Sequence, residues 1–532
     1  MRNFLQVAIL SALLLSSHET IKAQTLPFDP TFGTGGIANL TAIPGFYPLD
    51  MSLQADGKIL CMYANSSNTY ALRVKPDGNI DNTFLADLSY ELWPTPVAGA
   101  LQFTGKLCTP NEALIRETFD NKVIIAFGAA ILRVKSTGSV DSTFGNLSTA
   151  PGYLDINTFA PLHSLAALHD MYDAHSAGLY YAGPASVGIG NSDTIVIVKT
   201  TTNGVFDPTY GSGGQKYILL DSAKFGYPNA IRKIMFTNSG KILFTGQTHR
   251  PSSPTTQGDV FVARYNLDGT PDVTFGTNGV TIIDFGNFNQ DPWAITCAAN
   301  GEVYISGVQD TTLTSVTRQY FTFKMSPSGI ADMSYGSGGI VLDAPPVSVV
   351  AYAMSLTSTS YNKIYMAGFY TDGTFNYKNE YHSYTATGAP NTTFSPGGLV
   401  NNNTYERAQK LLTQPLDNKI LILGGDNTNP KLMRISGDLM PVQPNFAESV
   451  SRDNKKVWVA NDAAYISATN VHSILEATLM SVDGKRIRHY NQSDFVRGNN
   501  MSTVQLPNDI PTGLYILSVS ENGEAHYVKF VH

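Results

Sequence analysis

The sequence contains little charge and few cysteines. Charged residues make up only 14% of the 532 residues, and the formal net charge is −7. A mildly acidic surface repels the phosphates of nucleic acids, so we expect no nucleic-acid partner. The three cysteines are an odd number. Cys61 and Cys297 lie in apolar, strand-like runs far apart in the chain, which indicates buried free thiols rather than a disulfide.

The familiar catalytic and metal-binding motifs are missing. The sequence has no nucleophile elbow, no phosphate-binding loop and no His-Glu-x-x-His motif. One polar cluster offers ligand-type residues, but strand alternation would send His169 and Asp170 to opposite faces. We therefore expect neither a metal nor a cofactor, and we name no catalytic residue. The cluster consists of His163, His169, Asp170, Asp173 and His175.

Long apolar runs are also missing beyond the first residues. Residues 1–23 read as a signal peptide, with Arg2 before an apolar core from Phe4 to Leu15 and a small residue, Ala23, at the expected cleavage site. No later stretch approaches 18 uninterrupted apolar residues, so we expect no transmembrane segment. These features predict a secreted protein.

What the chain does have is a repeat of about 60 residues. Each of the first six copies has a turn glycine, then Asp or Asn three residues later, then an aromatic residue three further on, and the seventh copy keeps only the glycine. The glycine permits a positive φ, the Asp or Asn closes the turn through backbone N–H groups, and the aromatic residue can anchor one sheet against another. The glycines are Gly78, Gly138, Gly204, Gly269, Gly329, Gly388 and Gly437, and the turn residues are Asp81, Asp141, Asp207, Asp272, Asp332 and Asn391.

A second repeated mark precedes each turn. It is a short polar turn followed by an apolar run, as in Asp56-Gly57-Lys58-Ile59-Leu60, and it occurs seven times. Short β-branched and aromatic runs bounded by turn residues predict strands, and about four strands fit in each unit. Radial repetition of four-stranded sheets is a β-propeller. We therefore predict an all-β protein whose residues 24–444 form a seven-bladed propeller.

The ends of the repeat region predict how the ring closes. The seventh unit lacks the expected Asp-x-Thr-Phe-Gly, and the missing piece stands at the other end of the chain as Asp29-Pro30-Thr31-Phe32-Gly33. An N-terminal strand that completes the last blade would hide both sheet edges. The alternative is an open β-solenoid.

This pattern resembles the delta-60 repeat, a β-propeller repeat of large secreted bacterial proteins. The match is good at Leu72-Arg73-Val74-Lys75-Pro76-Asp77-Gly78 and at Ala263-Arg264-Tyr265-Asn266-Leu267-Asp268-Gly269. The resemblance implies a fold and supplies no mechanism, because the family carries no assigned catalytic residues.

The C-terminal region does not continue the repeat and has a different spacing of strands and turns. Residues 445–456 form a polar linker, and residues 457–532 read as a small β-sandwich with Ig-like character. They resemble the type A C-terminal sorting domain of the type IX secretion system, on a motif that includes Gly484, Lys485, Gly513, Tyr515 and Lys529. The resemblance implies that the secretion machinery is a partner and that the protein is exported across the outer membrane, then released or attached to the cell surface. The alternative is an ordinary Ig-like accessory domain.

Binding residues are expected in the loops between middle strands of units three to six. The best aromatic cluster there is Tyr370, Phe375, Tyr377 and Tyr381, which would either stack on sugar rings or cover a blade edge. The sequence thus favours a non-catalytic binding or structural platform for an unknown protein or glycan. The alternative is a polysaccharide hydrolase or lyase with its site at the mouth of the propeller.

Overall fold

The computed structural model divides the chain into two compact units. The first comprises Met1–Leu53 and Ile59–Asp438, and the second contains Leu439–His532. The structure describes residues 26–40, 47–65, 68–85, 95–97, 100–104, 113–145, 151–159, 164–165, 167–186, 194–220, 227–250, 253–284, 289–298, 300–310, 318–343, 350–359, 362–371, 377–402, 408–415, 417–425, 430–436, 457–460, 463–467, 475–481, 486–498, 501–507, 514–521 and 524–531. The predicted signal peptide and linker lie outside the described residues.

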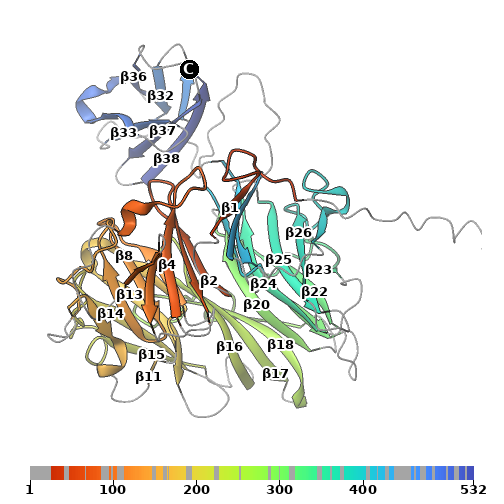
Figure 1. Cartoon of the computed structure of the whole chain (residues 1–532). Coiled ribbons are helices and arrows are strands. Elements are labelled where there is room, and N and C mark those ends of the chain that lie inside the picture. The colour runs from red at the N-terminus through yellow and green to blue at the C-terminus, as the bar shows by residue number, and fades with distance from the viewer. Residues whose placement is uncertain are drawn as a thin grey trace, which may run out of the picture. The chain divides into compact units, whose positions relative to one another are not determined.

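The described residues of the first unit form seven antiparallel sheets that succeed one another along the chain (Figure 1). The first three contain β2 (Tyr47–Leu53), β3 (Ile59–Ala64), β4 (Asn68–Val74), β5 (Thr95–Val97) and β6 (Ala100–Thr104); β7 (Ala113–Glu117), β8 (Val123–Phe127), β9 (Ala130–Val134) and β10 (Tyr153–Asp155); and β11 (Ser164–Leu165), β12 (Asp170–Asp173), β13 (Leu179–Ser186), β14 (Thr194–Thr200) and β15 (Gln215–Leu219).

The next three sheets have four strands each. They contain β16 (Tyr227–Phe236), β17 (Ile242–Arg250), β18 (Ser253–Tyr265) and β19 (Val280–Ile283); β20 (Gln290–Cys297), β21 (Val303–Asp310), β22 (Arg318–Met325) and β23 (Ile340–Asp343); and β24 (Val350–Ser358), β25 (Ile364–Thr371), β26 (Tyr377–Tyr384) and β27 (Leu399–Asn402). Short 3₁₀ helices connect some strands: η1 (Asn82–Leu85), η2 (Ile156–Phe159), η3 (His175–Ala177) and η4 (Pro396–Gly398). The all-β prediction is confirmed.

The seventh sheet combines the two ends of the repeat region. It holds β28 (Lys410–Thr413), β29 (Ile420–Gly425) and β30 (Pro430–Ile435), and its fourth strand is β1 (Ile37–Asn39). Ile37 pairs with Met433, and Asn39 pairs with Lys431. Figure 1 shows β1, in dark red, beside the blue-green strands of this sheet. The N-terminal segment therefore supplies the strand that the seventh repeat lacks.

The repeated aspartates hold one turn geometry. Oδ1 of Asp81 accepts hydrogen bonds from the backbone N–H of Thr83 at 3.1 Å and from its hydroxyl at 2.6 Å. Asn391 does the same with Thr393, at 3.3 and 2.7 Å. Equivalent bonds are made by Asp29, Asp141, Asp207, Asp272 and Asp332. The turn residues therefore have a structural role in the fold.

The second carboxylate oxygen pairs with a cation from the preceding strand. Arg73 Nε lies 2.9 Å from Asp81 Oδ2, and Arg434 Nε lies 2.8 Å from Asp29 Oδ2. The same Arg–Asp pair recurs at Arg133 and Arg264. Lysine replaces arginine in units three and five, and Ser383 pairs with Asn391 in unit six. We call this arrangement the turn latch.

The turn latch also joins neighbouring sheets. Arg73 Nη1 donates to the carbonyl of Ser136 in the next unit at 2.7 Å. Its guanidinium lies 4.8 Å from the ring centroid of Phe84, a cation–π contact. Arg434 makes the corresponding bond to the carbonyl of Pro76 at 2.8 Å, which links the seventh sheet to the first. One arginine thus fixes its own turn, its aromatic residue and the next sheet.

The repeated aromatic residues lie buried between successive sheets. Phe84 belongs to the same core cluster as Leu60 of its own sheet and Ile115 and Ile125 of the next. Phe32 likewise shares a cluster with Leu421 of the seventh sheet and Cys61 of the first. Middle strands such as β3 and β25 are buried along their whole length, because other sheets cover both of their faces.

The second unit contains two further four-stranded sheets. One holds β31 (Val457–Ala460), β32 (Ala463–Ser467), β35 (Val496–Gly498) and β36 (Met501–Gln505), and the other holds β33 (Leu475–Ser481), β34 (Arg486–Tyr490), β37 (Leu514–Glu521) and β38 (Glu524–Val531), with η5 (Gln492–Asp494) between strands. Its buried core includes Val504 from one sheet and Leu479 and Leu517 from the other. The unit therefore has a core of its own.

We predict that Asp141→Asn destabilises the first unit strongly. The substitution leaves the Arg133 guanidinium buried, with 1% of its side chain exposed, without its charge partner. Removing one partner of a buried ion pair costs about 3–5 kcal/mol of unfolding free energy. Chemical denaturation at pH 7 measures the loss. The control is Asp56→Asn, whose partner Lys58 lies at the surface, and here the cost should stay below about 1 kcal/mol. Equal losses would contradict the role of the latch.

Acid should weaken the same latches over a defined pH window. Burial opposes ionisation of Asp141, but hydrogen bonds from Thr143 and Lys122 and the charge of Arg133 outweigh it and lower its pKa to about 2. A carboxylate whose pKa is lowered on folding stabilises the fold above its unfolded pKa, and this contribution disappears as pH falls. The unfolding free energy should therefore drop between about pH 4 and pH 2, and less steeply in Asp141→Asn. Parallel pH profiles for the two proteins would refute this.

Candidate functional site

In each sheet of the first unit, one strand contacts the corresponding strands of neighbouring sheets. We call these the central strands: β2, β7, β12, β16, β20, β24 and β28. β2 contacts β7, β16 contacts both β12 and β20, β24 contacts both β20 and β28, and β28 contacts β2. Residues far apart in the chain therefore meet along them.

One position of the central strands is rich in charge. Each central strand pairs with the strand that follows it, and the position lies three residues before the end of that pairing. In β2, for example, Leu53 is the last paired residue, opposite Ile59, and the position is Asp50. The seven residues at this position are Asp50, Leu114, Asp170, Lys233, Ala294, Ser355 and Lys410. Four of the seven are charged. Together with Arg116, these four residues form what we call the charged centre.

Asp50 is the most tightly held member of the charged centre. Its carboxylate lies 2.5 Å from Arg116 Nη1 and 2.7 Å from Lys410 Nζ, and it accepts the backbone N–H of Ile115 at 3.0 Å. Burial opposes its ionisation, but the charges of Arg116 and Lys410 outweigh burial and hold the pKa of Asp50 well below its usual range. Asp50 therefore joins the first, second and seventh sheets through a carboxylate that is ionised at neutral pH.

Arg116 extends this network to the third sheet. Its Nη2 lies 3.1 Å from Asp170 Oδ1, and Asp170 Oδ2 accepts the backbone N–H of Phe236 at 2.9 Å. The guanidinium thus bridges two carboxylates that come from strands more than 100 residues apart. Water still reaches the network, since 22% of the Arg116 side chain and 23% of the Lys410 side chain are exposed.

Lys233 is the member of the charged centre that has no ion-pair partner. Among the described residues no hydrogen bond or salt bridge reaches its ammonium group, which interacts with Lys410, Asp50, Asp170 and Arg116 only through longer-range electrostatics. Desolvation and the positive charge of Lys410 lower its pKa to about 8 against the opposing pull of the two aspartates. Lys233 is nevertheless partly exposed to solvent.

His169, in the third sheet's segment, is also incompletely bonded. It precedes Asp170, and its buried Nδ1 atom has no hydrogen-bond partner. Desolvation and the nearby Lys233 charge lower its pKa to about 3, so the imidazole is neutral at pH 7. No group of three or more metal-ligating residues occurs in the part of the chain that the structure describes, and His163 lies outside that part.

β-Bulges present further side chains next to the charged centre. The β16–β17 and β20–β21 pairings skip one residue at Arg232 and one at Trp293, and such bulges change the direction of a side chain. Arg232 binds both oxygens of Asp291, at 2.7 and 3.1 Å, and lies over the Trp293 ring at 5.6 Å. The Trp293 and Tyr352 rings meet edge to face at 5.1 Å.

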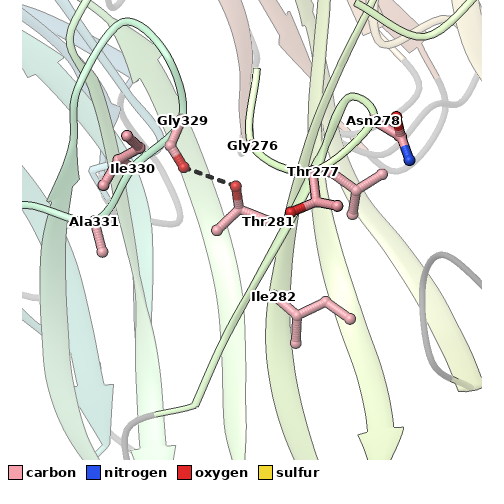
Figure 2. Close-up of a pocket in the computed structure, with 9 residues that line it drawn as sticks. Gly276, Thr277, Asn278, Thr281, Ile282, Gly329, Ile330 and Ala331 are labelled. Atoms are coloured by element: carbon pink, nitrogen blue, oxygen red, sulfur yellow. Dashed lines mark hydrogen bonds between the residues drawn. The ribbon is translucent and has the colours of Figure 1, made fainter. Parts of the chain in front are cut away.

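A groove lies between the turns and outer strands of the fourth and fifth sheets (Figure 2). It has a volume of about 560 Å³, and its lining includes Ile282, Ile330 and Asn278. Figure 2 shows the hydroxyl of Thr281 bonded to the carbonyl of Gly329 across it, at 2.7 Å. A second groove of about 460 Å³ shares Thr281 and Ile282. Asp284 is the one charged residue in the two linings, so the grooves offer apolar contact but little chemistry.

Two of the four predicted binding aromatics lie in the core of the first unit. Tyr370 and Tyr381 are buried in two core clusters, with 5% and 2% of their surface exposed. Their rings pack between sheets and are closed to a stacking sugar. Phe375 lies outside the described residues, as does the side chain of Tyr377 in β26. We therefore do not keep Tyr370 and Tyr381 as binding residues, and the role of Phe375 and Tyr377 stays a prediction.

The sequence contains a pattern that indicates the charged centre, but it lies in the strands and is missed when only the loops are considered. Lys233 and Asp170 each stand eight residues before the repeated mark that opens the following strand, at Lys241 and Gly178. A charge at the same place in several apolar strands indicates that those strands converge on a polar centre. The repeat alignment could have found it, but the cation–carboxylate partners come from different units.

We predict that Lys233→Met stabilises the protein. The lowered pKa means that the unfolded chain binds the Lys233 proton more tightly than the folded chain does. The unfolding free energy of the unmodified protein therefore rises with pH between about 8 and 10.4. Below pH 8 the charged amine destabilises the fold in full. Removing the amine should add about 1–2 kcal/mol at pH 7, and the gain should vanish toward pH 10.5. Chemical denaturation at both pH values measures it, with exposed Lys75→Met as the control. A loss of stability at pH 7 would contradict this account.

Comparison with known proteins gives a repeat and a fold type. A family described as a β-propeller domain of unknown function, DUF5122, matches residues 54–84 and 237–275. The two matched segments end at Phe84 and Phe275, the aromatic residues of units one and four. No curated protein matches the chain.

Similar solved structures are distant. One is the extracellular domain of a proposed one component system from B. thetaiotaomicron (TM-score 0.36, 12% identity, covering 96% of this chain and 57% of that one). Another is prolyl oligopeptidase B from Galerina marginata (TM-score 0.35, 12% identity, covering 80% and 56%). A third is a glucose dehydrogenase (TM-score 0.32, 9% identity, covering 59% and 93%). The chain spans little more than half the length of the first two.

No helix among the described residues is both long enough and apolar enough to cross a membrane. The DUF5122 match and the succession of four-stranded antiparallel sheets together support one identification: the chain is a β-propeller repeat protein.

Proposed function

We propose that this protein is a secreted or cell-surface propeller that acts as a non-catalytic binding or structural platform. The observation that carries the proposal is the charged centre. Its cations and carboxylates come from sheets at both ends of the repeat region, and its most buried carboxylate, Asp50, is ionised at neutral pH because Arg116 and Lys410 lower its pKa. A rigid set of fixed charges suits recognition of a ligand.

The proposed architecture is a seven-bladed ring closed by the N-terminal strand. Three contacts between the seventh and first sheets support closure: Lys410 with Asp50, Arg434 with the Pro76 carbonyl, and Phe32 in a core shared with Cys61. An open solenoid would leave the two terminal sheets apart. The delta-60 resemblance supports the same architecture.

The proposed route to the outside is the type IX secretion system, with the C-terminal domain as the signal. Support comes from the motif resemblance and from the separate core of the second unit. Tyr515 is buried in that core, and the backbone of Lys529 pairs with Ile516 in the last hairpin. Gly484, Lys485 and Gly513 lie outside the described residues. Two facing sheets are compatible with the proposed Ig-like sandwich.

The enzyme alternative receives no support from the charged centre. A glycosidase requires a carboxylic acid with a raised pKa that can donate a proton. Arg116 and Lys410 lower the pKa of Asp50, so it cannot serve as that acid near neutral pH. Its neighbour Asp170 is bound to the same guanidinium. Both carboxylates act as acceptors for cations of the protein.

The export proposal predicts that residues 439–532 are necessary for crossing the outer membrane. The full chain and a chain ending at residue 438 would be produced in a bacterium that has the type IX system and in a strain that lacks it. We expect the full chain in the culture medium or on the cell surface only in the first strain, measured by immunoblotting of fractions and protease accessibility. The shortened chain should remain in the periplasm. Export of the shortened chain, or export without the system, would refute the proposal.

A further inference from the structure

The junction between the fifth and sixth sheets has an unusual cation. His382 of β26 pairs with Asp343 of β23, and its Nδ1 atom lies 3.3 Å from Oδ2. This is the one ion pair between described residues of these two sheets. The fourth and fifth sheets, by contrast, are joined by Arg232 and Asp291, and a lysine joins the seventh sheet to the first. Arginine and lysine keep their charge at neutral pH, whereas a histidine can lose it.

A second carboxylate faces the other nitrogen of the same imidazole. Glu380 Oε2 lies 3.7 Å from His382 Nε2. Both side chains are buried, with 1% of Glu380 and 3% of His382 exposed, and neither oxygen of Glu380 has a hydrogen-bond partner among the described residues. A buried carboxylate without hydrogen bonds requires a cation close by. In the part of the chain that the structure describes, His382 is the one at ion-pair distance.

The two carboxylates together require the doubly protonated imidazole. A neutral imidazole carries one N–H, so it can donate toward Asp343 or toward Glu380 but not toward both. Burial opposes protonation of His382, but its contacts with the two carboxylates outweigh burial and raise its pKa to about 9. Burial also opposes ionisation of Asp343, yet the contact with His382 lowers the pKa of that carboxyl. The ion pair is therefore formed at neutral pH.

The other titratable groups packed around His382 are tyrosines. The Tyr320 ring of β22 meets the imidazole edge to face at 5.2 Å, and the Tyr384 hydroxyl of β26 donates to Asp343. Burial, and then the charge of a neighbouring carboxylate, raise the pKa of both tyrosines well above the usual range. His382 is thus the group that titrates as the solution turns from neutral to mildly alkaline. The tyrosines of this core cluster are Tyr320, Tyr335, Tyr370 and Tyr384.

We propose that Asp343, His382 and Glu380 form a proton-controlled clamp between the fifth and sixth sheets. With the imidazole doubly protonated, the clamp holds the end of β23 against β26. When the imidazole loses a proton, Glu380 is left buried without a charge partner, and the junction opens so that water reaches it. Asp343 can move readily, because it is the last residue of β23 and 39% of its side chain is exposed. The inference concerns control of the scaffold and depends neither on a ligand nor on the export route.

The direction of the pH effect follows from the raised pKa. In the opened junction His382 regains an ordinary pKa of about 6.5. The clamp therefore contributes its full stability below about pH 6.5 and loses it as pH rises through about 9. A difference of one pKa unit equals a factor of ten in an equilibrium constant. We expect the opening constant of the junction to rise at least about tenfold between pH 6.5 and pH 9.

Hydrogen exchange of the full chain, followed by mass spectrometry of its peptides, measures this opening. Exchange rates at about pH 6.5 and pH 9 are divided by the rates of an unfolded peptide at the same pH, so that the quotient reports opening alone. Peptides that cover β23 and β26 report on the clamp. Peptides that cover β8, in the second sheet, are the reference. Opening should rise at least about tenfold more at β23 and β26 than at β8.

Three variants complete the test. Asp343→Asn should fold, because the side chain is partly exposed, and should move the opening of β23 and β26 down by at least about one pH unit. His382→Gln should show the opening already at about pH 6.5, with no further rise specific to these strands. The matched control is His175→Gln, since His175 is exposed and lies 4.0 Å from Asp173, and its profile should equal that of the unmodified protein.

Two outcomes would overturn the inference. One is an equal rise in opening at β8, β23 and β26, which would indicate a loss of stability throughout the first unit. The other is a pH profile of Asp343→Asn that matches the unmodified protein. The Asp343→Asn comparison decides even where His382→Gln fails to fold.

Discussion

The propeller depends on one repeated ion pair, in which an arginine of one strand meets the aspartate of the following turn. The aspartate closes its own turn with one oxygen and holds the arginine with the other. The arginine then covers an aromatic ring and binds a carbonyl of the next sheet. Sheets that share few backbone hydrogen bonds are thus joined by charge-assisted contacts of fixed geometry. Where lysine or serine replaces arginine, the buried aromatic residue and the turn remain.

The charged centre uses the same kinds of group for a different purpose. In the turn latch the Arg–Asp or Lys–Asp pair is complete, and the structure gains stability from it. On the central strands Arg116 and Lys410 pair with Asp50, and Arg116 also pairs with Asp170. Lys233 makes no ion pair with a described residue, and desolvation and the charge of Lys410 lower its pKa to about 8. The latches stabilise the sheets, whereas this amine opposes folding.

Local chemistry determined much of this protein, and the sequence alone reveals it. Glycine at the turn, Asp or Asn three residues later and the following aromatic residue act within a few residues of one another, so their spacing predicts the turn and the strands. The N-terminal strand could also be predicted, because Asp29 to Gly33 completes the repeat that ends near Gly437.

Only the tertiary structure decided which side chains meet. Tyr370 and Tyr381 look like binding aromatics beside polar loops, but the neighbouring sheets bury them. Asp50, Arg116, Asp170 and Lys410 look like isolated charges in apolar strands, yet they form one network because the central strands converge. Whether a charged side chain finds a partner depends on which charged residues the other repeat units bring to the same place. The assembled sheets decide this, and no local pattern in the sequence expresses it.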